Sequence, residues 1–452
     1  MHILYVYADN PQEWNCSEWR CAVPARAINR SGLHSAGMLS LADFASQTPA
    51  AQAACMPAEV IVVQRNLIGD VLIAMQHWKA RGKTIVVDFD DAYDRMEPSN
   101  PAYPYWVQGQ KVLADGKTRV RIDPPPLTQF KWGLRLAHGA TTPSLRLAGD
   151  WQSYTSLYYL PNYIDLARYQ NVTAPASAAL QTTPPRPSPS QRAAMERETP
   201  PTSDDLGRRS PSQRAAMERE TPPTSDDLGR RSSSQRAALE RETPPRPIVI
   251  GWGGSLSHLE SFHDSGVMSA LQQVCQVRPN VKVMISGNDR RIFQSLPLPS
   301  QQKILHPWMP YDQWSSVLAQ FDIGIAPLAG PYDERRSWIK VLEYMVMKIP
   351  WIASDGPAYY DLGSYGRLVE NTTQAWRTAL LEVVDHLESE KMRAAGQPYL
   401  FGLAQSVDEN VNHIVDTYAA IRAGTRQAQG RQVQSQAASA NIHKIFTPIT
   451  SS

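Results

Sequence analysis

Short runs of apolar residues alternate with segments of helical pattern along most of this chain, and that alternation limits the folds open to it. Near the amino terminus, helices are expected over Glu18–Arg30, which Gly32 ends, and over Leu67–Arg81, which Gly82 ends. The strands expected around them are Ile3–Ala8, Glu59–Gln64, Thr84–Asp88, Ala140–Thr142 and Leu157–Leu160. Because apolar strands separated by helices are typical of a parallel sheet covered on both faces, we expect a doubly wound α/β domain.

A second unit with the same alternation begins at Pro247. Its expected strands are Ile248–Trp252, Val281–Ser286, Asp322–Leu328 and Pro350–Ser354, and its expected helices are Tyr311–Gln320, Trp338–Met347, Thr373–Leu387 and Asp408–Ile421. Ser257 and Glu260 have the spacing of a capping box that opens the helix after the first strand. In both units the carboxyl ends of the strands are the expected place for a ligand.

Residues 181–247 separate the two units and differ from both in kind. A 22-residue unit at 188–209 recurs identically at 210–231, and a partial, altered third copy follows at 232–247. The stretch has no Ile, Val, Phe, Tyr or Trp and holds 12 of the 36 prolines, so it cannot bury enough apolar surface to offset the entropy of ordering. We expect a disordered insertion at a domain boundary, with a partner-binding segment as the alternative.

A chain of 452 residues is too long for one hydrophobic core. The expected organisation is an N-terminal Rossmann-like domain at 1–175, the disordered repeat insert at 176–247, a C-terminal Rossmann-like domain at 248–403, a C-terminal helix at 404–425 and a disordered tail at 426–452.

The bulk composition argues against several classes of partner. A net charge of +2 gives no field that would favour nucleic acid. The start of the chain shows no secretory signal, and no apolar run approaches the ~20 residues of a membrane span. The cysteines match no metal-binding spacing, so reduced thiols in a cytoplasmic protein are expected; they are Cys16, Cys21, Cys55 and Cys275. Peripheral membrane association and the oligomeric state stay open.

The segment from Arg335 to Ser354 is the most informative for chemistry. Ser337 is placed to cap a helix in which Lys340 and Glu343, three residues apart, share one face. Free N–H groups and the positive dipole end at a helix start suit a phosphate, and a carboxylate one turn deeper could accept hydrogen bonds from vicinal hydroxyls. The alternative is a solvated ion pair on a surface helix.

Several segments together resemble the family 4, or group 1, glycosyltransferases, in a bacterial branch with short helical motifs. The similar segments, in the order of the family, are Thr84–Asp91, Leu160–Asp165, Ile250–Leu259, Asp322–Leu328 and the Lys340–Met345 helix with its following Ile349–Ser354 strand. The resemblance implies a GT-B fold, in which two doubly wound Rossmann-like domains face a cleft. It also implies transfer of a sugar from a nucleotide-diphosphate donor to a hydroxyl acceptor, without a metal or other cofactor.

The resemblance and the chemistry together assign candidate residues. Glycines let the backbone approach a diphosphate closely, and cations neutralise its charge. The donor-binding candidates are Gly253, Gly254, Ser255, His258, Gly287, Arg336, Lys340 and Glu343, with the Trp308–Tyr311 loop near the base. Candidates for a base that deprotonates the acceptor are Asp90, Asp91 and His138, and Arg20 is the acceptor-binding candidate. The carboxylates clustered at Asp88–Asp91 would also suit a divalent ion, or one of them could cap the next helix. Arg20 could instead be a surface residue.

One position departs from the family pattern. The family carries a glutamate eight residues before its ribose-binding glutamate, which corresponds to Glu343 here. The matching position in this chain is Arg335, and the nearest glutamate, Glu334, is one residue away. Two other functions therefore stay open. One is a catalytically inactive GT-B scaffold. The other is a GT-B sugar-nucleotide 2-epimerase, which the Lys340/Glu343 helix argues against.

Overall fold

A computed structural model describes residues 1–10, 15–113, 116–169, 246–287 and 290–424. The predictions of a disordered insert and tail fall outside these ranges, except for residues 246 and 247. The boundaries proposed from the sequence stay predictions.

The first sheet contains six parallel strands in the order β2-β1-β3-β4-β7-β8. The strands are β1 (His2–Tyr7), β2 (Ser35–Ser40), β3 (Val60–Gln64), β4 (Thr84–Asp88), β7 (Gly139–Thr142) and β8 (Leu157–Tyr159). The order reverses between β1 and β3, and a doubly wound sheet binds ligands at the carboxyl ends beside such a reversal. The predicted strands are confirmed, and β2 is an addition to them.

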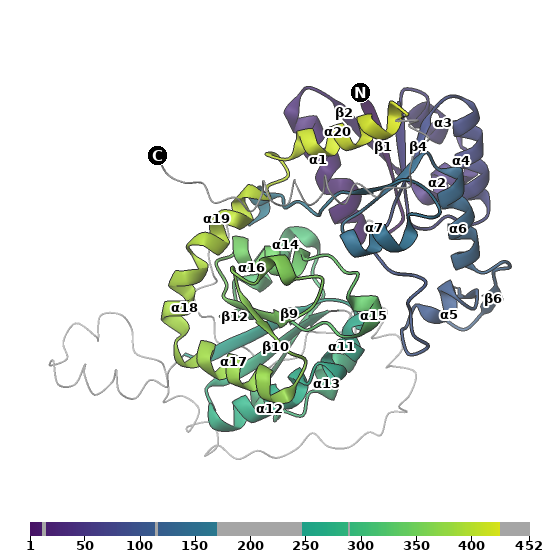
Figure 1. Ribbon diagram of the computed structural model, residues 1–452. Helices are drawn as coiled ribbons and strands as arrows, with labels where there is room; N and C mark the ends of the chain where they lie inside the picture. The colour runs from purple at the N-terminus through teal and green to yellow at the C-terminus, as the bar shows by residue number, and fades with distance from the viewer. Residues whose placement is uncertain (11–14, 114–115, 170–245, 288–289, 425–452) are drawn as a thin grey trace, which may run out of the picture. The chain divides into compact units, whose positions relative to one another are not determined.

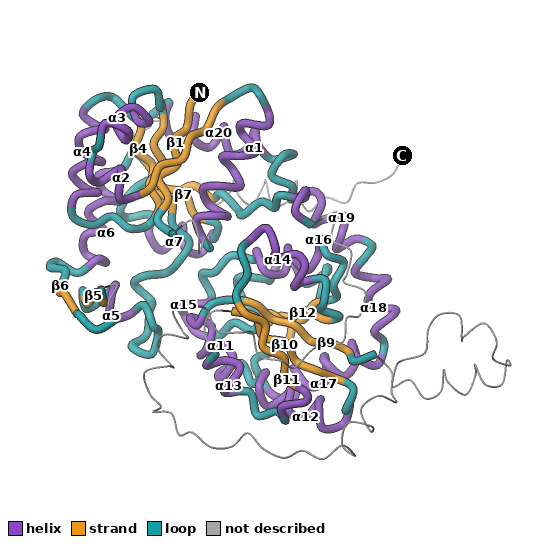
Figure 2. Tube along the Cα trace, turned by 180° about the vertical axis from the view of Figure 1, so that it is seen from behind, coloured by secondary structure: helices purple, strands orange, loops and turns teal. Residues whose placement is uncertain are grey.

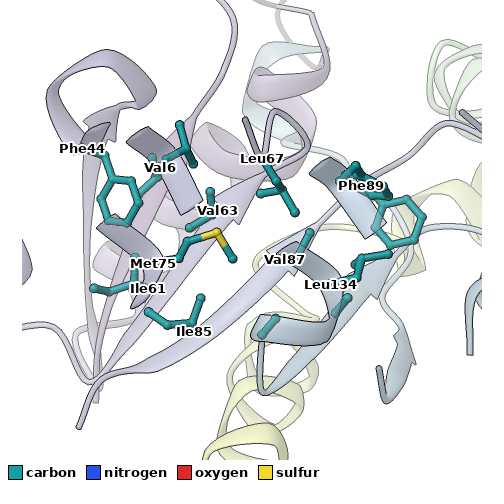
Figure 3. Packing of buried hydrophobic residues seen from close by; sticks show 14 of the residues in the cluster. Val6, Phe44, Ile61, Val63, Leu67, Met75, Ile85, Val87, Phe89 and Leu134 are labelled. Atoms are coloured by element: carbon teal, nitrogen blue, oxygen red, sulfur yellow. The ribbon is translucent and has the colours of Figure 1, made fainter. Parts of the chain in front are cut away.

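Helices cover both faces of this sheet (Figure 1). They are η2 (Glu18–Ala22, a π-helical turn), α1 (Val23–Ser31), α2 (Leu41–Ser46), α3 (Pro49–Cys55), α4 (Asp70–Ala80), α5 (Tyr103–Trp106), α6 (Pro126–Leu136), α7 (Leu145–Trp151) and η3 (Leu166–Arg168). A separate hairpin joins β5 (Gln110–Val112) to β6 (Arg119–Arg121). Alternate residues of each strand enter opposite cores, as the pleat requires. Figure 3 shows one of these cores, which includes Val6, Phe44, Ile61, Met75 and Val87.

The second sheet has six parallel strands in the order β11-β10-β9-β12-β13-β14. They are β9 (Ile248–Gly253), β10 (Val281–Gly287), β11 (Lys303–Pro307), β12 (Ile323–Ala326), β13 (Trp351–Ser354) and β14 (Arg367–Val369). This is the Rossmann order 3-2-1-4-5-6, which reverses between β9 and β12. The edge strands β11 and β14 were not expected from the sequence, because both are half-buried and carry a weak apolar pattern.

Helices also cover both faces of the second sheet (Figure 2). They are η5 (Leu256–His258), α11 (Leu259–Asp264), α12 (Val267–Val277), α13 (Arg291–Ser295), η6 (Ser300–Gln302), α14 (Tyr311–Leu318), α15 (Gly330–Asp333), α16 (Ile339–Val346), η7 (Tyr360–Leu362), α17 (Thr373–Asp385), α18 (Leu387–Ala394) and α19 (Gln397–Ala404). Among the helices of the described residues, none is long and apolar enough to cross a membrane.

The last described helix, α20 (Val411–Arg422), belongs to the core of the first sheet. Ile164 and Ser406 form a parallel bridge before it. Tyr418 then meets Tyr5 of β1 edge to face, with ring centroids 6.0 Å apart. The chain therefore returns to its N-terminal half after completing the second sheet.

Two predicted helix caps are wrong. Helix α16 begins at Ile339, and the hydroxyl of Ser337 accepts a hydrogen bond from the Asn162 side chain instead of from the helix. Ser257 likewise gives no cap, since its hydroxyl lies 2.8 Å from Ser255 Oγ and accepts from Arg336. In both cases a partner distant in sequence takes the oxygen that a local cap would have used.

Candidate active site

A cleft of about 730 Å³ lies where strands of both sheets reach their carboxyl ends. From the first sheet, residues that follow β1, β3 and β4 line it, and from the second, residues that follow β9, β10 and β12. Both reversals of strand order therefore open into this cleft. Its volume falls in the ~300–1,000 Å³ range of small-molecule sites.

A glycine turn after β9 forms the floor on the side of the second sheet. A Cβ on Gly253 would lie 2.1 Å from the Trp314 ring, and one on Gly287 would lie 2.5 Å from the carbonyl oxygen of Gly254. The Gly254 N–H donates to the Ser286 carbonyl at 3.1 Å. Glycine is required because neighbouring atoms fill the space of a side chain, and the turn leaves bare backbone facing the cleft.

Lys340 and Glu343 both line the cleft from α16. The Lys340 ammonium donates to the Gly253 carbonyl and lies 4.9 Å from the centroid of the Trp252 ring. Trp314 Nε1 and the Tyr169 hydroxyl donate to Glu343 Oε1 at 2.7 and 3.0 Å. Burial lowers the pKa of Lys340 to about 8 and raises the pKa of Glu343 to about 7. The two charges are therefore held in the wall of the cleft, and the surface ion pair considered from the sequence is wrong.

Arg336 and His258 complete the polar wall beside the glycine turn. The Arg336 guanidinium donates to Asp333 at 2.6 Å and to Ser257 Oγ at 2.8 Å. His258 is buried, and burial, together with Arg336 and Lys340, lowers the pKa of its imidazole well below the usual value. Its Nδ1 is buried without a hydrogen-bond partner. The imidazole is therefore neutral beside Lys340 and Arg336, of which Arg336 is paired with Asp333.

Two aspartates after β4 line the opposite side. Burial and the nearby Asp91 raise the pKa of Asp90 to about 6, and Asp90 Oδ1 is buried without a partner. Asp91 lies 3.8 Å from the guanidinium of Arg336, which joins the two sides of the cleft. Asp90 therefore lines the cleft with one carboxylate oxygen that has no hydrogen-bond partner.

The structure places two predicted site residues elsewhere. Arg20 is buried, with Nε and Nη2 donating to Asp88 at 2.9 and 2.7 Å, and Nη1 donating to Leu160 and Asn162. It does not line the cleft, so the prediction that Arg20 binds the acceptor directly is wrong. Its hydrogen bonds instead support the loop at Leu160 and Asn162. His138 precedes β7, at the amino end of that strand, and its Nδ1 accepts from the Ile85 N–H at 2.9 Å. The predicted strand is confirmed, but His138 lies at its amino end, whereas the cleft lies at the carboxyl ends of the strands. His138 is therefore not positioned to act as the base.

The departure at Arg335 also has a structural explanation. Its guanidinium donates to Asp150 of α7 at 2.5 Å and to the Pro331 carbonyl at 2.7 Å, and Glu334 pairs with Arg146 at 2.9 Å. Neither Arg335 nor Glu334 lines the cleft. Position 335 therefore serves contact with the first half of the chain.

Sequence reasoning missed several cleft residues. Asp9 and Arg65, which follow β1 and β3, form an ion pair in the lining, and Arg65 adopts a left-handed φ of 37°. Tyr93, also in the lining, was unmarked, and so was Tyr169, which donates to Glu343 without lining the cleft, since an aromatic residue inside a loop gives no signal of its position. Asp9 and Arg65 could have been found by the rule that residues just after parallel strands gather at one edge. Among the described residues, no three His, Cys, Asp or Glu side chains converge so as to share a metal ion.

Comparisons with known proteins agree with this geometry. Residues 248–386 match the family model described as glycosyl transferases group 1. A sucrose-phosphate synthase from Thermosynechococcus elongatus is similar in structure with a TM-score of 0.55 at 11% identity, over 94% of this chain and 100% of that one. The N-terminal domain of a Candida albicans trehalose-6-phosphate phosphatase has a TM-score of 0.51 at 9% identity, over 93% of this chain and 99% of that one. A Neisseria meningitidis UDP-GlcNAc 2-epimerase has a TM-score of 0.46 at 10% identity, over 93% of this chain and 100% of that one. No curated protein matches the sequence.

Two parallel six-stranded sheets with a cleft at their strand ends define a protein of the GT-B class. Residues 248–386, from β9 to the end of α17, form a group 1 glycosyltransferase domain. The chain is a glycosyltransferase, as the resemblance of its motifs implied.

Proposed function

We propose that the cleft binds a nucleotide-diphosphate sugar and transfers the sugar to a hydroxyl acceptor without a metal ion. The observation that carries this is the placement of Lys340 and Glu343 on α16, next to the glycine turn of a group 1 domain. The diphosphate would meet backbone N–H groups of the turn together with Lys340 and Arg336, which neutralise the leaving charge. Glu343 would accept hydrogen bonds from the ribose, and the Trp308–Tyr311 loop, also in the lining, would face the base.

The acceptor would enter from the side of the first sheet. Its oxygen forms a bond to the anomeric carbon as the bond to the diphosphate oxygen breaks, and the electron pair leaves with the diphosphate. If the configuration inverts, Asp90, whose Oδ1 lacks a hydrogen-bond partner, would take the acceptor proton. If it is retained, a phosphate oxygen of the leaving group can take it.

The proposal extends to a step of glycan biosynthesis in a bacterial cytoplasm. Its support is the resemblance to a bacterial branch and the four cysteines, all of them free thiols.

The test supplies purified full-length protein with UDP-, GDP- and dTDP-sugars and measures release of nucleotide diphosphate and binding by calorimetry. We expect release that depends on an acceptor. Glu343→Ala should weaken nucleotide binding by about 1–3 kcal/mol through lost hydrogen bonds. Glu388→Ala, on an exposed carboxylate of α18, is the matched control. Nucleotide binding without turnover would favour the scaffold, and isomerisation of the bound sugar without release would favour the epimerase.

A further inference from the structure

We infer that the first-sheet side of the cleft selects an uncharged saccharide as acceptor and excludes a phosphorylated one, with Tyr93 and Asp90 as the specificity-determining residues. This inference rests on the proposed function. We call this surface the acceptor wall: Asp9, Trp19, Arg65, Asp90, Asp91, Tyr93, Tyr105 and Trp106, all in the lining of the cleft.

The charge of the acceptor wall opposes an anion. It carries three carboxylates and a single guanidinium, and that guanidinium, of Arg65, is already paired with Asp9. Asp91 is offset by Arg336, whose other nitrogens are held by Asp333 and Ser257. A phosphate on the acceptor would meet Asp90 with no unpaired cation of the acceptor wall beside it. Like charges so close together are costly away from bulk water.

Two buried polar atoms on this wall lack a partner. Tyr93 is only 1% exposed, and its hydroxyl has no hydrogen-bond partner, as is also true of Asp90 Oδ1. Buried polar groups are normally satisfied, because leaving one unpaired costs about 1–3 kcal/mol. A sugar hydroxyl can donate to the carboxylate oxygen while accepting from the phenol. A hydroxyl-rich ring therefore supplies what these two atoms lack.

Aromatic rings supply the apolar part of the same surface. Tyr93 stacks on Trp106 with ring centroids 3.8 Å apart and planes 16° from parallel, which fixes the position of its hydroxyl. Trp19 is half-buried and meets Tyr311 edge to face at 4.8 Å. Ring faces beside a few placed polar groups suit a ligand with C–H faces and hydroxyl edges, which describes a pyranose.

The experiment measures binding by saturation-transfer NMR and calorimetry, on the full chain, with and without nucleotide diphosphate. The probes are neutral methyl glycosides of glucose, galactose, mannose and N-acetylglucosamine and the 6-phosphates of the same sugars. We expect at least one neutral glycoside to bind about tenfold or more tightly than its 6-phosphate. A phosphate that binds equally or more tightly than its neutral counterpart would overturn the inference.

The variant Tyr93→Phe separates recognition from folding. Because the hydroxyl is unpartnered, its removal should leave the melting temperature unchanged or higher while glycoside affinity falls about five- to tenfold. Tyr154→Phe, outside the cleft lining, is the matched control and should change neither. Trp19→Ala should also weaken glycoside binding. Unchanged glycoside affinity in both Tyr93→Phe and Trp19→Ala would refute the assignment. Nucleotide binding is recorded separately, so failure of the donor site cannot be mistaken for failure of the acceptor wall.

Discussion

Lys340 meets a backbone carbonyl and an indole face, whereas Glu343 meets an indole N–H and a phenol. Burial disfavours the charged form of both side chains, and the attraction between Lys340 and Glu343 offsets part of that effect. An incoming diphosphate would add counter-charge for Lys340, and a ribose would add hydrogen-bond donors for Glu343. The shifted pKa values of the pair are typical of a binding site, where charged groups are held for a ligand even though this lowers the stability of the free protein.

The acidity of Lys340 leads to a prediction for donor binding. With its pKa lowered to about 8 by burial, the ammonium is charged below that pH and neutral above it. Nucleotide diphosphate affinity should therefore fall as pH rises from 7 to 9, by about five- to tenfold, because a charge-assisted hydrogen bond is lost. Calorimetric titrations across this range check it. Lys340→Arg, which keeps its charge, should give a flatter profile, in which the remaining pH dependence comes from Glu343 with its pKa of about 7. A flat profile in the unaltered protein would contradict the role of Lys340.

For individual residues, the sequence predicted which side chains share a face of one helix, but not which side chains distant in sequence they contact. The sequence shows that Lys340 and Glu343 share a face, because three residues make most of a turn. It could not show that Tyr169 and Trp314 reach Glu343, since these residues come from two separate segments. For the same reason Arg20 was read as an acceptor contact, when its partner Asp88 lies 68 positions away.

At the scale of elements, the segment just before α16 connects that helix to the first half of the chain. Each of its residues from 335 to 338 contacts the first half of the chain: Arg335 reaches Asp150, Arg336 reaches Asp91, Ser337 accepts from Asn162, and Trp338 Nε1 lies 3.3 Å from the Tyr159 hydroxyl. The helix that carries Lys340 and Glu343 therefore starts from a fixed point. Arg335 makes one of these contacts at the position where the resemblance led us to expect a glutamate.

A charge swap tests this contact. Arg335→Glu places like charges together at a largely buried pair and should lower the free energy of unfolding by about 2 kcal/mol. Asp150→Arg in addition restores an opposite pair and should recover most of the loss, which a double-mutant cycle in denaturant measures. If Arg335→Glu alone instead tightened donor binding, position 335 would face the donor after all.

The helix α20 should be essential for the first half of the chain. Ile414 is 2% exposed in the core shared with Tyr5 and Val62. Ile414→Ala would leave a cavity there and should cost about 2–4 kcal/mol, measured by denaturant unfolding. Met392→Ala, at 72% exposure on α18, should change stability by less than about 0.5 kcal/mol. Equal effects of the two substitutions would mean that α20 is not part of this core.

For the whole molecule, the alternation of strands and helices predicted two parallel sheets because fully buried strands read as continuous apolar runs. Val60–Gln64 and Thr84–Asp88 are buried throughout and were found with nearly correct ends. The edge strands β2, β11 and β14 are largely half-exposed, so their pattern resembles that of a loop. The return of α20 to the first sheet could not be foreseen, since an amphipathic helix shows that it has a core to join but not which one.

The repeated 22-residue unit gives the last prediction, which concerns the entire chain. Deleting 188–231 removes two copies that offer few apolar side chains, so no packing should be lost. The shorter connection should close with ~0.5–1 kcal/mol less entropy cost, so the melting temperature should stay within about two degrees or rise slightly. The control replaces the same residues by a Gly/Ser linker of equal length, which separates the effect of the repeat sequence from that of its length. Nucleotide affinity should be the same in the unaltered protein, the deletion and the linker variant. A drop of more than about five degrees in both altered proteins would show that the repeats pack on the enzyme, whereas a drop in the deletion only would show that the connection needs its full length. An unchanged melting temperature with acceptor transfer lost in both altered proteins would instead assign the repeats to partner or acceptor binding. The repeat sequence, rather than its length, would then be the determinant.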